Sequence, residues 1–333
     1  MILRPKLLGH APVAVSSAGP AAPAAPVPSW LRAAVAGPVS LENAAFAAAA
    51  ALATLDAVVR REEKAAGAWR HRLALAAAAA TAKRAGRVED AAALRDALLL
   101  TRPGDEVGPA GRILLAWRTL ASRPVASLLS DSVLADVAAD LGGPLDAAAA
   151  GQIGDDIRPL AGAVGNALAA AADAIAVLER HDGRAARALG PWLADAVLAD
   201  QLGWSRAVPL LGTHPSPAAG SGRSSPMEQR QSPQAARQRI FAGYARAALQ
   251  AVDLAAELGR RAERLLAVAP KLRAKGSDAV VERLLFDDAL AASRADKKTG
   301  MSDRGLRRLF DRLVELGAVR ELSGRTTFRI YGL

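Results

Sequence analysis

The sequence predicts a mainly α-helical fold, with an Ala/Leu-rich multi-helix domain followed by a smaller C-terminal domain that ends in a short β-hairpin. Hydrophobic residues make up 51% of the 333 residues but aromatic residues only 4%, so alanine and leucine supply most of the apolar content. Both residues favour helices over strands. Apolar positions recur at helical spacing through most of the chain, and only its end combines β-branched and aromatic side chains as a hairpin does.

Composition divides the chain into five segments. Residues 1–40 are rich in alanine and proline and are predicted to be a disordered tail. Residues 41–211 form the helical domain, and residues 212–234, which are dense in serine, proline and glycine, form a flexible linker. Residues 235–276 contain a long basic helix and its connection to the C-terminal domain, which covers residues 277–333.

The helical domain contains a series of segments that turn signals such as RPGDEVGP, LGGP and RHDGR separate. In the segment that starts at residue 68, Trp69 and Leu73 are expected in the core, whereas Arg70 and His71 are expected in solvent. The predicted helices cover residues 41–63, 68–84, 89–100, 111–121, 125–141, 157–180 and 190–202.

The positive charge of the chain is unevenly distributed. The net charge is +10, yet residues 1–215 are nearly neutral and most of the excess lies in residues 216–276. A single helical pattern covers residues 235–268 of this region, and Pro270 ends it. The charge is explained either by a solvated linker and helix face or by a footprint for nucleic acid. The apolar positions of the long helix are Ile240, Tyr244, Ala248, Val252, Leu258 and Leu265.

Several kinds of chemistry have little support in the sequence. The chain has no cysteine, which excludes disulfides, thiolate metal sites and cysteine nucleophiles. Its four histidines lack the spacing of metal ligands, and Gly162 and Gly165 lie in a predicted helix rather than after a strand. We therefore expect no metal, no cofactor and no catalytic residue. Adjacent acids are interpreted as helix-surface charges at Glu62-Glu63, Asp155-Asp156 and Asp287-Asp288.

One polar region of the helical domain, residues 86–112, keeps an enzyme among the alternatives. Its charged side chains either line a cleft or form salt bridges along helices and loops, and the sequence leaves both interpretations open. The residues concerned are Glu89, Asp90, Arg95, Asp96, Asp105, Glu106 and Arg112.

No apolar stretch has both the length and the uniformity of a membrane span. Residues 73–82 cover only half a span, and residues 160–178 contain Asn166 and Asp173. Prolines and His10 interrupt the N-terminal region, which therefore lacks the apolar core of a signal peptide. We expect a cytoplasmic protein without membrane contact.

The clearest single helix covers residues 302–316. Ser302 is a natural N-cap, Asp303 suits the first turn, and Gly317 stands where a left-handed residue ends a helix. Arginines lie on the face opposite to its apolar positions. Those apolar positions are Leu306, Leu309, Phe310, Leu313, Val314 and Leu316.

A hairpin is predicted directly after this helix. Residues 319–322 and 326–331 have strand composition, and Ser323-Gly324-Arg325 joins them with an arginine at the tip. Upstream, residues 278–288 form an amphipathic helix and residues 289–296 a lesser one.

Three helices followed by a two-stranded wing resemble the winged helix-turn-helix fold, over residues 277–333. The segment GMSDRGLRRLFDRLVELGAVREL followed by GRTTFRIY is similar to the recognition helix and wing of bacterial regulators. Nearly the whole chain, through motifs such as WRHRLALAAAAA, EDAAALRDA, GPAGRILLAWRTLASRP and RAERLLAVAPKLRAKG, also resembles the bacterial domain-of-unknown-function family numbered 1403. That family implies no function.

The winged-helix resemblance implies binding to double-stranded DNA. The first half of the terminal helix would enter the major groove, and basic residues of the wing and connections would contact phosphates. Alternatively, the helix arginines are solvated and pair with Asp311 and Glu315. The candidate DNA-binding residues are Arg304, Arg307, Arg308, Arg312, Arg320, Arg325, Arg329, Lys271, Arg273, Lys275, Lys297 and Lys298.

Two functional classes therefore lead. The first is a non-enzymatic DNA-binding protein, in transcriptional regulation or replicon and plasmid maintenance, whose helical domain binds a partner or dimerises. The second is an assembly subunit whose winged helix docks on protein, as in kleisin-type complexes. An enzyme with a site in the helical domain is the third.

Overall fold

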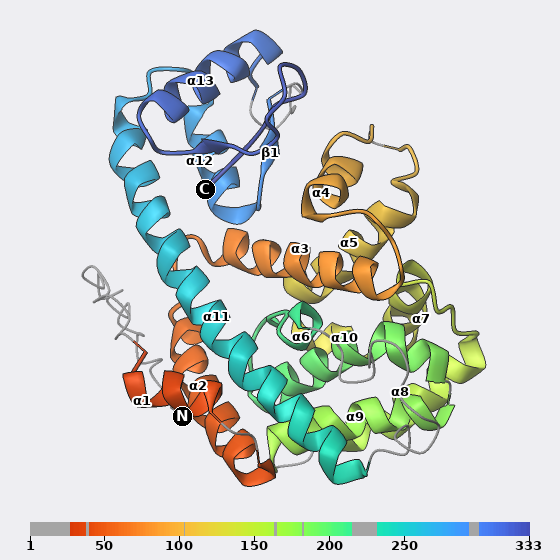
Figure 1. Ribbon diagram of the computed structural model, residues 1–333. Coiled ribbons are helices and arrows are strands. Elements are labelled where there is room, and N and C mark those ends of the chain that lie inside the picture. Colours follow the sequence, from red (N-terminus) through yellow and green to blue (C-terminus); the bar gives the residue numbers. More distant parts are fainter. Residues whose placement is uncertain are drawn as a thin grey trace, which may run out of the picture.

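The mainly α-helical class is confirmed by the computed structural model, which describes residues 27–37, 40–102, 104–162, 165–181, 183–214, 232–292 and 300–333. A large helical body carries a smaller C-terminal module at one end, and the long helix α11 (Pro233–Val268) runs along both (Figure 1). The other helices of the body are α1 (Ser29–Ala36), α2 (Leu41–Arg61), α3 (Ala66–Arg84), α4 (Ala91–Leu99), α5 (Gly108–Ser122), α6 (Val125–Leu128), α7 (Asp131–Asp140), α8 (Ala147–Gly162), α9 (Ala167–His181) and α10 (Gly183–Gln201).

Helix α11 is the main brace of the molecule. Its 36 residues correspond to about 54 Å, and its most extensive partner is α2. The Ser232 Oγ accepts a hydrogen bond from the Ala235 N–H at 3.2 Å, which caps its start. Trp69 of α3 donates from Nε1 to the Ala251 carbonyl oxygen at 2.9 Å. All six apolar positions predicted for this helix are buried.

Alanine gives the core its close helix packing. Small side chains at the buried positions of α2, α3 and α10 allow helix axes to approach closely, and tryptophans fill the wider spaces. Trp117 donates from Nε1 to the Thr81 Oγ1 at 3.0 Å, and Trp192 donates to the Ala116 carbonyl at 2.9 Å. Both indole N–H groups are therefore satisfied inside the core.

One described helix, α2, is long and apolar enough to cross a membrane by length and composition alone. Its buried residues, among them Ala48, Leu52 and Leu55, belong to the hydrophobic core. The sequence analysis considered two other stretches, residues 73–82 and 160–178, as possible membrane spans and rejected both.

Two predicted helices are each divided in the structure. The predicted helix 157–180 is wrong as one element, because α8 ends at Gly162 and α9 starts at Ala167. The Asn166 side chain accepts from the N–H groups of Leu168 (3.1 Å) and Ala169 (3.2 Å), and this cap starts a new helix. The predicted helix 125–141 is similarly divided into α6 and α7 at Ser130, whose backbone is extended.

Arg70 and His71 were expected in solvent but are buried. His71 hydrogen bonds through Nε2 to the Ser122 Oγ at 2.9 Å, and its Nδ1 lies 3.5 Å from the Asp287 Oδ1. Burial lowers the pKa of the Arg70 guanidinium. Because Ser122 and Asp287 offer polar partners to His71, α3 is buried on its polar side as well as on its apolar side.

Part of the predicted tail and part of the predicted linker are structured. Helix α1 lies within residues 1–40 and buries Leu31. At the other segment, Leu211–Thr213 forms the 3₁₀ helix η1. The Asp195 carboxylate accepts from the N–H groups of Leu210 (2.7 Å) and Leu211 (3.0 Å). Residues 1–26 and 215–231 lie outside the described residues.

The C-terminal module combines two helices and a small sheet. Helix α12 (Ser277–Phe286) is followed by β1 (Leu290–Ala291), α13 (Asp303–Glu315), β2 (Arg320–Glu321) and β3 (Ile330–Gly332). The sheet order is β1-β3-β2, and both pairs are antiparallel, with Leu290 opposite Tyr331 and Arg320 opposite Gly332. The rings of Phe310 and Tyr331 stack at a centroid distance of 4.4 Å and join α13 to the sheet.

Two local predictions fail in this module. The lesser helix predicted for residues 289–296 is contradicted at its start by β1, and residues 293–299 lie outside the described residues. The hairpin pairing is shorter than predicted, because residues 326–329 belong to no strand. The connection between β2 and β3 covers residues 322–329 instead of the three predicted residues. The Glu321 carboxylate stabilises its start by accepting from the N–H groups of Ser323 (2.8 Å) and Gly324 (2.9 Å).

A buried carboxylate fixes the module to the helical body. Asp288 is only 1% exposed, and it pairs with Arg72 of α3 and with Arg95 of α4, the latter at 3.0 Å. Burial raises the pKa of the Asp288 carboxyl, but the two guanidinium groups outweigh burial and hold the pKa below its usual range. Arg261 of α11 donates to the Leu333 carbonyl at 2.9 Å. The interpretation of Asp287-Asp288 as surface charge is therefore wrong.

Candidate nucleic-acid interface

Helix α13 presents the candidate residues on a fixed frame. The Ser302 Oγ accepts from the Gly305 N–H at 3.2 Å, so the predicted N-cap is confirmed. Leu306, Leu309, Phe310 and Leu313 are buried and hold one face of the helix against the module. The opposite face is therefore held towards solvent by packing rather than by its own charges.

Three arginines in the first half of α13 are free for a partner. Arg304, Arg307 and Arg308 are exposed, and none of them forms an ion pair or hydrogen bond with the described part of the chain. Arg312, near the helix end, differs because it donates to the Glu315 carboxylate at 2.6 Å. The uncompensated positive charge of α13 thus lies towards its N-terminus.

The arginines around β2 and β3 are engaged with acidic side chains. Arg320 lies 3.6 Å from Glu257 of α11, and Arg325 pairs with Asp96 of α4. Arg329 lies 3.7 Å from Asp311 of α13. Arg325, predicted at the hairpin tip, thus has an acidic partner from the helical body. These partly exposed pairs contribute about 0–1 kcal/mol each, so a polyanion could replace the carboxylates at small cost.

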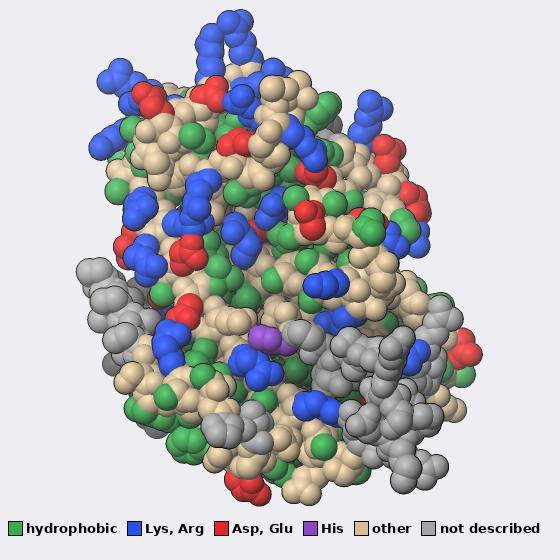
Figure 2. Space-filling view, viewed as in Figure 1, with side chains coloured by type: hydrophobic (Ala, Val, Ile, Leu, Met, Phe, Trp, Pro, Cys, Tyr) green, Lys and Arg blue, Asp and Glu red, His purple; other side chains and the backbone are tan. Residues whose placement is uncertain are grey.

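The cations of the connection continue the basic surface. Lys271 ends the 3₁₀ helix η2 (Ala269–Lys271), Arg273 and Lys275 follow it, and all three are exposed between α11 and α12. Lys and Arg side chains gather over the C-terminal module and beside the upper part of α11 (Figure 2). Lys297 and Lys298 lie outside the described residues.

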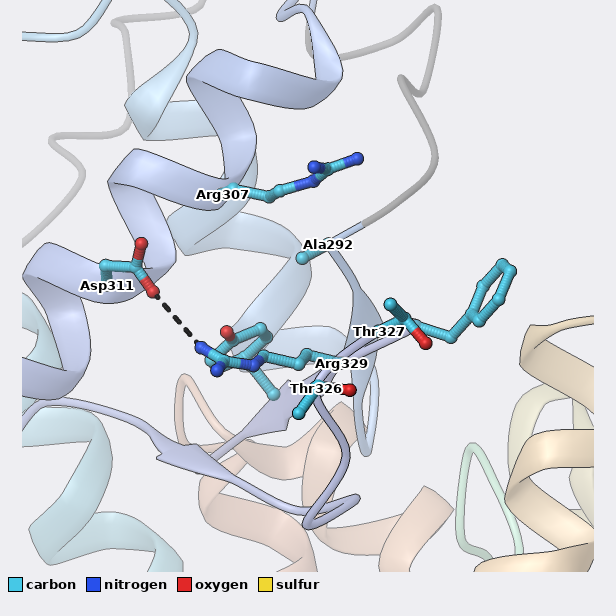
Figure 3. A pocket seen from close by; sticks show the side chains of 8 residues that line it. Ala292, Arg307, Asp311, Thr326, Thr327 and Arg329 are labelled. Atoms are coloured by element: carbon cyan, nitrogen blue, oxygen red, sulfur yellow. Dashed lines mark ion pairs between the residues drawn. The ribbon is translucent and has the colours of Figure 1, made fainter.

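A pocket opens between α13 and the segment that leads into β3. Its volume is about 310 Å³, and Arg307 of α13 and Arg329, next to β3, both line it, with Thr327 to one side of them (Figure 3). Thr326 and Phe328 also line it. The sequence placed residues 326–329 in a strand, and no single-sequence signal marks them as the wall of a pocket.

The polar region predicted for residues 86–112 is divided among structural contacts. The Asp90 carboxylate caps α4 by accepting from the Ala93 N–H at 2.8 Å, and Arg112 pairs with Glu106 at 2.5 Å. Arg95 and Asp96 instead face the C-terminal module, through Asp288 and Arg325. Within the described ranges, no group of three or more His, Asp or Glu side chains is placed to hold a metal ion.

These features define a mainly α-helical protein whose small C-terminal module presents a basic helix beside a short antiparallel sheet. The chain belongs to the family described as a protein of unknown function (DUF1403), whose model matches residues 18–333. No curated protein matches the chain.

Proposed function

We propose that this protein binds double-stranded DNA through its C-terminal module, with the first half of α13 in the major groove. The observation that carries the proposal is the group of three exposed arginines Arg304, Arg307 and Arg308, which have no ion-pair or hydrogen-bond partner among the residues that the structure describes. A helix of 13 residues is about 20 Å long and fits the groove, where arginines reach guanine edges and phosphates.

The arrangement of the module supports this proposal. The elements follow in the order α12, β1, α13, β2 and β3, and the sheet order β1-β3-β2 suits a winged-helix domain. The segment between β2 and β3 would be the wing, and its arginines would exchange carboxylate partners for phosphates. Regulation of transcription and maintenance of a replicon both use such binding.

Fluorescence anisotropy with a labelled duplex, on the full chain at several salt concentrations, tests the proposal. Arg308→Gln is expected to weaken binding and to reduce the slope of log K against log salt by about 0.9, the share of one phosphate. The matched control is Arg237→Gln, which removes an equal charge from α11 where Arg237 pairs with Asp173 at 2.6 Å. If wild type and Arg308→Gln bind the duplex with equal affinity, or if both variants lose equal affinity, α13 is not the DNA-binding helix.

A role of the helical body in self-association is a second candidate function. Trp30 of α1 and Phe46 of α2 are 53% and 60% exposed, and their rings lie 5.8 Å apart. The two rings form a small apolar patch that a second copy of the chain would cover on association. Sedimentation over a range of concentrations should show a dimer that Phe46→Gln abolishes, and a monomer at every concentration would exclude it.

A further inference from the structure

The pocket between α13 and β3 has a charge that selects an anion. Arg329 is matched by Asp311, and its Nε also donates to the Arg325 carbonyl at 3.1 Å. Arg307 has no such match within the described part of the chain. The pocket therefore holds one uncompensated guanidinium, and guanidinium groups bind phosphate strongly.

Two hydroxyl groups add unassigned hydrogen-bonding capacity. Thr326 and Thr327 line the pocket, both are exposed, and neither hydroxyl bonds to a residue that the structure describes. In Figure 3, the Thr327 side chain lies to one side of the two arginines. A hydroxyl donates one hydrogen bond and accepts others, so the pair suits a phosphate oxygen or a sugar hydroxyl.

Phe328 is held in a conformation that its own chemistry disfavours. Its φ of 54° lies in the left-handed region, and its side chain is 59% exposed. A left-handed backbone costs a residue with a Cβ roughly 1–2 kcal/mol, and such strain concentrates at functional sites. The exposed ring gains nothing from the core and is available for stacking.

We propose that this pocket binds a single nucleotide unit, with its phosphate on Arg307 and the threonine hydroxyls and its base against Phe328. A volume of about 310 Å³ lies at the lower end of the range for small-molecule sites and is larger than a phosphate alone requires. The nucleotide is either free or part of a DNA strand, and only the second source rests on the proposed function.

Isothermal titration of the full chain tests the site with three probes: a deoxynucleoside monophosphate, the matching nucleoside and inorganic phosphate. The monophosphate is expected to bind at least about tenfold more tightly than either part, because stacking and a charged hydrogen bond contribute separately. Phosphate that binds as tightly as the monophosphate would overturn the role of the base.

Variants locate the binding. Arg307→Gln is expected to weaken binding of the monophosphate about tenfold, whereas Arg237→Gln, which removes the same charge from α11 outside the pocket, leaves it unchanged. Phe328→Asn is expected to weaken it about tenfold, and asparagine tolerates the left-handed backbone, so the fold is retained. Equal loss in the two arginine variants would overturn the site.

Two DNA probes separate the sources. A duplex with one unpaired terminal nucleotide is compared with a blunt duplex, and preference for the unpaired end that Phe328→Asn abolishes supports a strand nucleotide. Binding of the monophosphate without any DNA binding supports the site and contradicts the proposed function. Binding of blunt duplex alone, with neither monophosphate binding nor preference for the unpaired end, overturns the site and leaves the proposed function standing.

Discussion

Arg72 of α3 contacts the carboxylate of Asp288, which lies 216 residues further along the chain. Asp288 is 1% exposed and also pairs with Arg95, so one buried carboxylate is shared by two guanidinium groups of the helical body. Interactions of this kind are costly to break, because each partner left behind is a poorly solvated charge.

Asp288→Asn should lower the free energy of unfolding by about 3–5 kcal/mol, since it leaves Arg72 and Arg95 without a counter-charge. Urea unfolding at neutral pH measures this. The control Asp173→Asn breaks an exposed pair with Arg237 and should cost at most about 1 kcal/mol. Because the folded pKa of Asp288 is lowered, its stabilisation is present above the unfolded pKa near 3.9 and is lost as pH falls through the folded pKa. Similar losses in both variants would show that the pair is no more than a surface contact.

Asp195 should make stability fall as pH rises. Burial raises the pKa of its carboxyl to about 7, although the N–H groups of Leu211 and Leu210 oppose the rise. Its stabilising contribution is complete below the unfolded pKa near 3.9 and is lost as pH rises through about 7. Relative to Asp195→Asn, the wild type should lose up to about 4 kcal/mol between pH about 4 and about 8, as measured by urea unfolding. Arg84 and Tyr244 are the other ionisable groups that face this carboxyl. A stability difference between wild type and Asp195→Asn that stays constant with pH would contradict the prediction.

Gly212→Ala should destabilise the protein, because a Cβ at this position would lie 2.1 Å from the Trp117 ring. Overpacking of a filled core costs typically about 1–3 kcal/mol. Gly162→Ala is the matched control, since nothing lies within 4 Å of its added Cβ, and it should be neutral or slightly stabilising. Thermal unfolding followed by circular dichroism compares the two. An unchanged melting temperature for Gly212→Ala would mean that Trp117 can move aside.

Asp96→Asn should strengthen DNA binding. It releases Arg325, whose side chain is 49% exposed and which joins the C-terminal module to α4 by pairing with Asp96. One additional phosphate contact would steepen the salt dependence by about 0.9. Asp173→Asn changes the net charge equally and should leave the slope unaltered. If both variants tighten binding without a change of slope, bulk charge rather than Arg325 is responsible.

The sequence predicted best where local signals agree. The limits of α13 follow from capping residues, and the apolar period of α11 identifies its buried face, because both depend on residues close together in the chain. At the break between α8 and α9, Gly162, Gly165 and the Asn166 cap are local break signals, but the alanine-rich sequence on both sides favoured one continuous helix.

The candidate nucleic-acid interface was predicted only in part. The exposed arginines of α13 follow from the helical period, but their freedom and the engagement of Arg325 depend on where Asp96 lies in space. His71 and Asp288 were expected at the surface, because no local pattern shows that α3 and the C-terminal module bury each other's charges. Phe328 was placed in a strand, since its composition favours one and only the tertiary fold shows the chain leaving the sheet.

The ion pairs of Asp288 also limit how the C-terminal module can be separated from the helical body. If residues 277–333 are removed and fused to another protein, the remaining helical body loses the carboxylate that pairs with Arg72 and Arg95. Both guanidinium groups then lack a counter-charge. The recipient would receive a carboxylate with no cation to match it. The helical body and residues 277–333 therefore share one buried ion-pair network. We expect the C-terminal module to be exchanged between relatives without loss of stability only if the recipient has arginines at the positions of Arg72 and Arg95.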